Sequence, residues 1–444
     1  MKIAFILPAI GKKKKKKYIG TWKMEPLTIA LLKALTPGYI KTCFFDDRIE
    51  LIPYDTDADI IAITVETYTA RRAYEIAAEF RSKGKIIIMG GYHVTALPDE
   101  AAEHADILVT GNAETVWPEL IRDLRNKQHK RLYHSSSGFS AVEPDRSIYK
   151  NKKYLPLSLV ETGRGCPFSC EFCSISQYYE STYHLREIDD VIRDIRASKH
   201  RYFFFVDDNI VANKEYAMKL FDAIKKEKIY WAGQGTITMA KDKELLKKMR
   251  DSGCIIMLIG FESLDSNNLN QMNKTWSLKL GDIDELIQNI HDYGISIYAT
   301  FLFGFDNDNR ESFSEVIEFV NRHKFFFAAF NHLLPFPGTQ LYKRLEKENR
   351  LIYKKWWLED NYYYGDISYE PQKLEAKKLS SLCRDARNEF YKLSGVFSRF
   401  WTLLKRSKNW YLIFIFLAFN IQLGSEVDQK MRIPVGRGLD ELPK

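Results

Sequence analysis

Residues 163–173 read GRGCPFSCEFC, so Cys166, Cys170 and Cys173 follow one another at a C-x3-C-x2-C spacing. Cysteine thiolates are the usual ligands of iron–sulfur clusters. Three of them on one tight loop leave the fourth iron of a [4Fe-4S] cluster without a protein ligand, and chemistry can take place at that open iron. The loop therefore predicts an iron–sulfur site with one free coordination position.

Two other interpretations of these cysteines explain less of the sequence. A structural zinc site needs four closed tetrahedral ligands, yet Ser176 and Gln177 follow the loop and His184 lies well downstream. Three simply buried cysteines conflict with the flanking Gly165 and Pro167, which mark tight backbone. Because spacings of several cysteines are specific signals, we favour the cluster.

The composition is that of a globular protein with an uneven charge. A chain of 444 residues is long enough for two domains with separate cores. Hydrophobic residues make up 45% and charged residues 28%, which excludes global disorder. The formal net charge is +8, and Lys12 to Lys17 form one uninterrupted run. We interpret this run as a solvated loop or as a contact for an anionic partner such as a lipid headgroup.

The other cysteines and the N-terminus bear on the compartment. Cys43, Cys254 and Cys383 are scattered and predict no disulfide framework, which fits a reducing cytoplasm. The apolar stretch from Ile3 to Ile10 is too short for a signal-peptide core, contains Pro8, and has its lysines after it. It predicts a first strand instead.

Short apolar runs alternate with helical patterns in the first third of the chain. This alternation predicts a parallel sheet covered by helices on both faces. Ligands of such sheets bind at the carboxyl ends of the strands. The expected strands are 3–7, 60–65, 86–89 and 106–110.

A second series of strands and helices begins at Leu157. Polar and glycine residues follow successive strands there, which is typical of the catalytic rim of an α/β barrel. The expected strands are 157–162, 202–206, 255–259, 296–303 and 325–334.

The cysteine motif, with Phe172 directly before its last cysteine, resembles that of the radical S-adenosylmethionine (radical SAM) superfamily. The resemblance implies that SAM chelates the open iron through its amino and carboxylate groups. It implies that one electron cleaves SAM to methionine and a 5'-deoxyadenosyl radical, and that Phe172 lies against the adenine. It also implies a partial (β/α)6 barrel and an electron donor such as a flavodoxin or ferredoxin.

Four strand ends match recurring motifs of that barrel. Each has an ordinary explanation as well, since Glu262 could cap the next helix and 335–339 could be only a turn. Four matches in the right order are hard to obtain by accident. The resemblance assigns SAM contacts to Asp207 after the second strand, Glu262 in 260–263, Gly304 in 303–305, and Pro337 and Gly338 in 335–339.

The N-terminal part resembles the cobalamin-binding domain that precedes some radical SAM domains. The resemblance implies a cobalamin bound near Gly90, Gly91, His93, Gly111 and Glu114.

One departure from the cobalamin pattern leaves alternatives open. The D-x-H-x-x-G signature, whose histidine ligates cobalt in some cobalamin proteins, is absent, because residues 46–50 read DDRIE. Either cobalamin binds without a histidine from that motif, or the domain has lost the cofactor. His93 is either a ligand contact or a loop histidine satisfied by backbone.

We expect an α/β chain in four parts. These are a Rossmann-like domain of the cobalamin-binding type at 1–135, a linker at 136–156, a radical SAM partial barrel at 157–345, and a helical C-terminal extension at 346–444.

The extension contains a strongly apolar segment at 410–423. A transmembrane helix needs about 20 apolar residues, and this segment is shorter and interrupted by Asn420 and Gln422. An interfacial helix resting on a bilayer is one interpretation, with 396–424 as a peripheral membrane contact. A buried core helix or an oligomer contact is the other.

The resemblance implies an enzyme that uses a [4Fe-4S] cluster, SAM and cobalamin to methylate an unactivated carbon of an apolar, lipid- or pigment-like small molecule. Ring formation or oxidation without methyl transfer is the alternative within the same family. A non-catalytic cobalamin or iron–sulfur sensor is the alternative from another class. We expect a cytoplasmic protein, or one at the inner face of the membrane, with no nucleic-acid partner.

Overall fold

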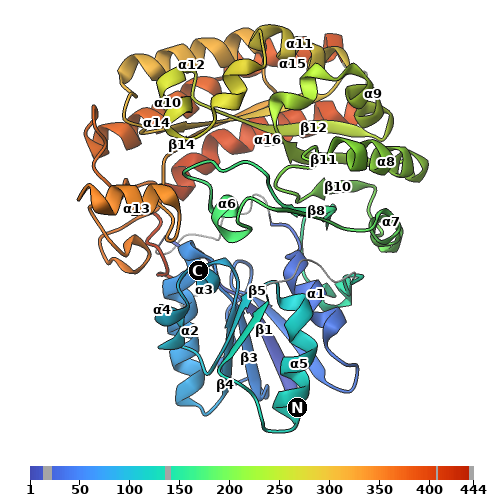
Figure 1. The fold of residues 1–444 in the computed structure, drawn as a ribbon, viewed down its shortest axis with the longest axis vertical. Helices are drawn as coiled ribbons and strands as arrows, with labels where there is room; N and C mark the ends of the chain where they lie inside the picture. Colours follow the sequence, from blue (N-terminus) through green and yellow to red (C-terminus); the bar gives the residue numbers. More distant parts are fainter. Residues whose placement is uncertain (14–22, 136–141, 407–408, 440–444) are drawn as a thin grey trace.

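Two α/β units are stacked along the long axis of the molecule, with helix α6 and the cysteine loop between them (Figure 1). The computed structural model describes residues 1–13, 23–135, 142–406 and 409–439. Most of the lysine run and the first part of the expected linker therefore lie outside the described residues. Lys12 itself is buried, and its N–H donates to the carbonyl of Arg437 at 2.9 Å.

The first unit contains a six-stranded sheet in the order β2-β1-β3-β4-β5-β6, and all of its pairings are parallel. The predicted Rossmann-like sheet is confirmed, with two additional edge strands, β2 and β6. The chain reverses its strand order between β1 and β3, so ligands are expected at the carboxyl ends there. The strands are β1 Lys2–Leu7, β2 Lys41–Asp46, β3 Ile60–Thr64, β4 Ile86–Gly90, β5 Ile107–Gly111 and β6 Leu132–Ser135.

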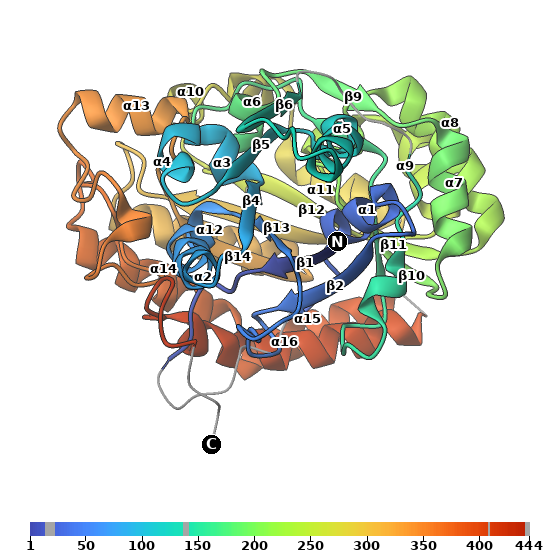
Figure 2. The same ribbon diagram turned by 90° about the horizontal axis from the view of Figure 1, so that it is seen from below.

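Helices cover both faces of this sheet (Figures 1 and 2). Helices α1 and α5 pack on one face, where Trp117 is buried against Phe5. Helices α2, α3 and α4 lie on the other face. Their bounds are α1 Leu27–Leu35, α2 Ala70–Ser82, α3 Tyr92–Ala96, α4 Pro98–Ala102 and α5 Ala113–Arg125.

The second unit is an open, six-stranded parallel sheet in the order β7-β10-β11-β12-β13-β14, which is the predicted partial barrel. Strand β11 was not predicted, because its sequence YWAGQG contains two glycines and little apolar periodicity. The strands are β7 Ser158–Val160, β10 Tyr202–Phe205, β11 Tyr230–Gly235, β12 Cys254–Glu262, β13 Ser296–Phe303 and β14 Phe327–His332.

The outer face of the partial barrel is covered by amphipathic helices. Alternate strand residues such as Met257 and Ile259 point into this outer core. The helices of this unit are α6 Ser174–Tyr178, α7 Ile188–Ala197, α8 Lys214–Ile224, α9 Lys243–Asp251, α10 Ser266–Gln271, α11 Ile283–Asp292, α12 Arg310–His323 and α13 Gln340–Lys347.

The C-terminal extension joins the two units instead of forming a third. Trp356, Trp357 and Tyr362 are fully buried in the core on the α2 face of the first sheet. Helix α14 (Ala376–Phe390) packs against β14 at the edge of the barrel, where Tyr391 Oη donates to the Ala328 carbonyl at 3.0 Å.

Helices α15 (Leu393–Arg406) and α16 (Trp410–Lys430) complete the extension. Helix α16 closes the amino-terminal end of the barrel, since Tyr411 stacks on Tyr202 at 3.8 Å and Phe416 contacts Phe326. The interpretation of 410–423 as a buried helix is therefore correct for the face of α16 that packs against the barrel. Among the described residues, no helix combines the length and the apolar character that crossing a bilayer requires.

Candidate active site at the cysteine loop

A two-stranded antiparallel ribbon carries the cysteine loop. Strand β8 (Gly163–Gly165) pairs with β9 (Tyr183–Leu185), and the loop turns into α6 directly after Cys173. Gly165 has a φ of +86°, and a Cβ there would overlap the carbonyl oxygen of Thr182. Only glycine permits this close approach, so the ribbon explains why glycines precede the first cysteine.

The three thiols lie close enough to influence one another. Burial raises the pKa of Cys166, and it raises that of Cys170 to about 12 although the nearby Lys274 opposes this. Cys173 contributes to both shifts by its own charge. No group of three or more His, Cys, Asp or Glu side chains among the described residues is placed to hold a single metal ion.

Several buried polar atoms around the loop have no hydrogen-bond partner within the described part of the chain. Asn209 is almost fully buried, and its Nδ2 lies 4.0 Å from Cys166 Sγ, while its Oδ1 has no partner among the described residues. The same holds, within the described ranges, for Tyr183 Oη and Trp276 Nε1, and Trp276 stacks on Phe168 at 4.3 Å. Because buried polar groups normally form hydrogen bonds, these atoms are suited to bind a polar ligand beside the thiols.

The acidic exit of β10 positions the loop. Asp207 accepts hydrogen bonds from the N–H and Oγ1 of Thr162 at 3.0 and 2.5 Å, and Asp208 accepts one from the N–H of Gly165 at 2.9 Å. Burial raises the pKa of Asp207 to about 7 and that of Asp208 to about 6. Asp207 thus holds the strand that delivers the cysteines.

Glu262 occupies an unusual backbone position at the end of β12. Its φ is +66°, and the strand register shifts between Gly260 and Glu262. Its carboxylate pairs with the buried Lys274 Nζ at 3.1 Å, which also donates to the Gly260 carbonyl at 2.7 Å. The alternative that Glu262 caps the next helix is wrong, because Asp265 caps α10. Non-glycine residues in this conformation are often found at functional sites.

The remaining predicted SAM contacts differ in their surroundings. Phe172 borders a cavity that is described below. A Cβ added to Gly338 would meet no close neighbour, since the nearest atom outside the adjoining residues is Gln177 Cγ at 3.7 Å. At Gly304, by contrast, the space for a side chain is filled by Tyr369, whose Oη donates to the Gly304 carbonyl at 2.8 Å. Gly304 therefore admits a protein side chain from the extension.

The residues matched to the cobalamin domain are largely engaged with the protein itself. His93 is fully buried, with Nδ1 3.3 Å from Thr67 Oγ1 and Nε2 3.1 Å from both Tyr74 Oη and Glu100 Oε1. A Cβ at Gly91 would lie 2.8 Å from the Val65 carbonyl oxygen. These contacts favour the interpretation of His93 as a satisfied loop histidine, although its partners are side chains.

Glu114 connects the first unit to the cysteine loop. Arg164 Nη2 donates to Glu114 Oε1 at 2.5 Å, and Arg164 also donates to Asn112 Oδ1 at 3.2 Å and to Glu161 at 2.7 Å. Burial opposes ionisation of Glu114, but Arg164 more than compensates and lowers the pKa of this carboxyl. No local pattern in the sequence predicts this role of Arg164, because Glu114 and Asn112 are distant from it in the chain.

A cavity of about 390 Å³ lies beside the loop, where four parts of the chain meet. The carboxyl end of β14 and the segment after it contribute Phe330 to Leu334, the cysteine loop contributes Phe172 and Cys173, the first unit contributes Tyr68, and the C-terminal extension contributes Arg387. Such convergence of separate elements on a cavity is typical of a binding site.

Comparison with known proteins agrees with this geometry. Residues 160–320 match the family model of the radical SAM superfamily. Bacteriochlorophyllide d C-12(1)-methyltransferase of Chlorobaculum tepidum is 33% identical over 389 residues, which cover 84% of each chain. Hopanoid C-2 methylase of Rhodopseudomonas palustris is 25% identical over 74% of this chain and 66% of its own length.

Solved structures share the fold. The cobalamin-dependent S-adenosylmethionine radical enzyme OxsB, with aqua-cobalamin and S-adenosylmethionine bound, has a TM-score of 0.67 at 14% identity over 95% of this chain and 71% of that chain. The methyltransferase TsrM from Kitasatospora setae, with cobalamin and a [4Fe-4S] cluster bound, has a TM-score of 0.61 at 13% identity, over 78% and 75%.

These likenesses define a radical SAM enzyme, whose class uses a [4Fe-4S] cluster and SAM. The chain belongs, within that superfamily, to the family of the bacteriochlorophyllide d methyltransferases. The unpaired Asn209 Oδ1 and the three neighbouring thiols fit these cofactors, with Cys166, Cys170 and Cys173 as the residues that would hold the cluster.

Gly111 provides a test of whether the glycine motif serves the backbone. Its φ is +74°, and a Cβ there would overlap the carbonyl oxygen of Ser135 on β6. We expect Gly111→Ala to destabilise the protein by about 3 kcal/mol, from backbone strain plus overlap. Gly84→Ala is the matched control, since Gly84 has a φ of +72° with open space around it and should cost only about 1 kcal/mol. If thermal denaturation shows that Gly111→Ala and Gly84→Ala lose the same amount of stability, the close approach of Gly111 to the Ser135 carbonyl is contradicted.

The Glu114–Arg164 pair predicts a pH dependence of stability. Because the pKa of Glu114 is lowered in the folded protein, its stabilisation is present above the ordinary value of 4.5 and is lost as pH falls through the folded value. We expect Glu114→Gln to cost about 1–3 kcal/mol at neutral pH. The difference from wild type should narrow as the pH falls below 4.5.

Thermal denaturation followed by circular dichroism over a pH series measures this difference. Glu119→Gln is the control, because Glu119 pairs with Lys130 at the surface. A cost at Glu114 that stays constant down to acid pH would contradict the ion pair as its source.

Proposed function

We propose that this protein methylates an unactivated carbon of an apolar, pigment- or lipid-like small molecule, with a [4Fe-4S] cluster, SAM and cobalamin as cofactors. The observation that carries the proposal is the cavity at the carboxyl ends of β13 and β14, which is bordered by Cys173 and Phe172 of the cysteine loop and by Tyr68 of the first unit. When bound, the cluster supplies the electron for reductive cleavage of SAM, and cobalamin supplies a methyl carrier.

The chain's own residues support binding and shielding of these groups. The carboxyl ends of β3, β4 and β5 face the cysteine loop, as Tyr92 Oη donating to the Ser174 carbonyl at 2.8 Å illustrates. Cobalamin would bind there without His93 as a cobalt ligand, since both ring nitrogens of His93 are engaged. Aromatic side chains at the cavity, including Phe330 and Phe336, would exclude water from the reacting groups.

The relatives that are methyltransferases favour methylation, whereas a relative that is a cyclase favours ring formation as a second candidate function. The methyltransferases and methylases named above act on pigments and hopanoids according to their names. An anaerobic magnesium-protoporphyrin IX monomethyl ester cyclase from Cereibacter sphaeroides is 25% identical over 74% of this chain. Ring formation without methyl transfer is therefore the second candidate function.

Comparative mass spectrometry distinguishes these candidates. Pigment and lipid extracts of cells with and without the gene should differ by a CH2 unit if the protein is a methyltransferase. A loss of hydrogens without added carbon would instead support cyclisation or oxidation.

The ligand assignment is tested by Cys170→Ala. We expect this variant to lose both the visible absorbance of the reconstituted cluster and reductant-dependent 5'-deoxyadenosine formation, because three thiolates are needed to hold the cluster. Cys43→Ala is the control, since Cys43 lies on β2 in the first unit. Wild-type protein with an intact cluster and no 5'-deoxyadenosine would favour a non-catalytic sensor. Unchanged turnover of Cys170→Ala would refute the assignment.

We propose further that an electron donor such as a flavodoxin or ferredoxin reduces the cluster, and that the protein contacts the inner face of the membrane through 396–424. Two apolar stripes support the membrane contact. On α15 the exposed stripe is Leu393, Phe397, Trp401 and Leu404, and on α16 it is Trp410, Phe414, Leu417 and Ile421.

Charge favours an anionic bilayer as the partner of this outer face. The segments 393–406 and 409–423 contain no Asp or Glu, and the exposed Lys405 and Arg406 stand at the end of α15. Exposed aromatic residues with basic neighbours are typical of helices that rest in the headgroup region.

Vesicle flotation tests this contact. We expect wild-type protein to float with phosphatidylglycerol-containing vesicles and to do so less with pure phosphatidylcholine. The triple variant Trp401→Ser, Trp410→Ser, Phe414→Ser should lose flotation, because it removes the side chains that would enter the bilayer. The control is Tyr39→Ser with Leu132→Ser, which removes exposed hydrophobic side chains elsewhere. Flotation of the triple variant at the wild-type level, or a wild-type dimer that the triple variant abolishes, would overturn the proposal.

A further inference from the structure

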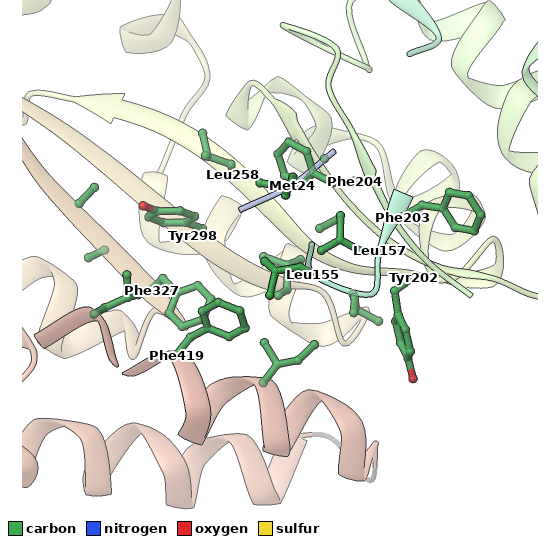
Figure 3. A pocket seen from close by; sticks show the side chains of 18 of the residues that line it. Met24, Leu155, Leu157, Tyr202, Phe203, Phe204, Leu258, Tyr298, Phe327 and Phe419 are labelled. Atoms are coloured by element: carbon green, nitrogen blue, oxygen red, sulfur yellow. The ribbon is translucent and has the colours of Figure 1, made fainter. Parts of the chain in front are cut away.

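A second and larger cavity, of about 530 Å³, lies inside the partial barrel (Figure 3). Its walls are the inward-facing residues of the strands, so Ile256 and Leu258 line it while Met257 and Ile259 point to the outer helices. In Figure 3, Phe204 of β10, Leu258 of β12 and Tyr298 of β13 lie around it, together with Leu155 and Leu157 from the segment leading into β7. The lining is mostly apolar and includes Leu155, Phe204, Leu258, Tyr298, Phe327 and Phe419.

Helix α16 forms the floor of this cavity. Tyr411 stacks on Tyr202 at 3.8 Å, and Phe419 contacts Phe327 with ring centres 6.2 Å apart. The helix thereby lines the cavity at the amino-terminal end of the barrel, and the cavity extends toward the carboxyl ends of the strands, where Asn331 lines it. An occupant would therefore point one end toward the cysteine loop.

The barrel cavity and the cavity beside the cysteine loop adjoin. Asn331, Tyr364 and Arg387 line both of them, while Phe172 and Cys173 line only the latter. One elongated molecule can therefore extend from the apolar interior of the barrel to the reacting groups at the loop.

Arg387 places a positive charge at this junction. Its Nη2 donates to Asn331 Oδ1 at 2.9 Å and to the Phe330 carbonyl at 3.3 Å. Among the described residues it forms no ion pair with a carboxylate, unlike the partly buried Arg164 and Arg344. Burial lowers the pKa of the neighbouring His332, which disfavours its protonated form. A half-buried guanidinium between two cavities, without an acidic partner, is suited to an anionic ligand.

We propose that the two cavities form one site for an amphipathic substrate, whose carboxylate pairs with Arg387 and whose apolar body occupies the barrel. This inference rests on the proposed function and specifies its substrate class. A carboxylate matches one guanidinium in charge and in its planar, two-pronged geometry. A phosphate monoester carries about −1.5 to −2 charge and would leave excess charge in an apolar environment. The carboxylate then decides which carbon of the substrate faces the cysteine loop.

Fluorescence titration with dansylaminoundecanoic acid and its methyl ester tests the site. The protein is used as purified, without SAM or reductant, so binding is measured independently of turnover. We expect the acid to bind about tenfold more tightly than the ester, because only the acid forms a charged hydrogen bond with Arg387.

Three variants assign this preference to residues. Arg387→Gln should bind acid and ester alike, and Arg387→Lys should restore part of the preference because it retains the charge. Ala232→Phe, which fills part of the barrel cavity, should weaken both probes. Arg322→Gln is the control, since Arg322 lies exposed on the outer helix α12.

Two results would overturn the inference. One is equal binding of acid and ester by wild-type protein, which needs no variant to fold. The other is an acid preference that persists in Arg387→Gln. Either result could coexist with normal formation of 5'-deoxyadenosine, which would leave the proposed radical function intact and reject only the substrate class.

Discussion

The arrangement of the two units depends on one largely buried cation, Arg164, placed between the two glycines that shape the cysteine loop. Its guanidinium reaches Glu161 between β7 and β8 and Glu114 at the start of α5. A buried ion pair is costly to break, because removal of one partner leaves the other charge uncompensated. The pair therefore holds the cysteine loop against the carboxyl edge of the first sheet.

Glycines and acidic residues at the strand ends of this fold can serve either the packing of the chain itself or the binding of a cofactor. Gly111 is required by the nearby Ser135 carbonyl, and Gly304 by the ring of Tyr369. Glu114 serves the contact with Arg164, whereas a Cβ at Gly338 would make only ordinary contacts, the nearest with Gln177 at 3.7 Å. Parallel strands that end at one edge bring their following loops close together, so the chain itself needs glycines where a cofactor would also need them. Such motifs identify the edge of the sheet more reliably than the atoms that a ligand touches.

This distinction explains how far the sequence could be read. Buried parallel strands such as β3 and β4 are continuous apolar runs, and the cysteine spacing is local, so both the fold class and the loop were predictable. Strand β11 escaped prediction because two glycines weaken its pattern. The roles of Lys274 and Arg387 depend on contacts with distant segments, which no local pattern encodes. The packing of Trp356 onto the first unit is likewise a long-range contact, since its neighbours there lie far away in the chain.

Helix α16 shows why the barrel interior bears on function. A helix that is apolar on all sides needs cover on more than one face, and its inner face is covered by the barrel. Its Tyr411 and Phe419 border the barrel cavity without filling it, although protein interiors are normally close-packed and apolar space without contacts costs stability. Larger side chains at Ala232 or Ala329 would fill part of the same volume. The small residues Ala232 and Ala329 leave this volume open, and aromatic rings of α16 line it at one end. Arg387 lies at the other end, where the barrel cavity meets the cavity beside the cysteine loop. This shape and polarity are those of a binding site for an elongated molecule with one polar end.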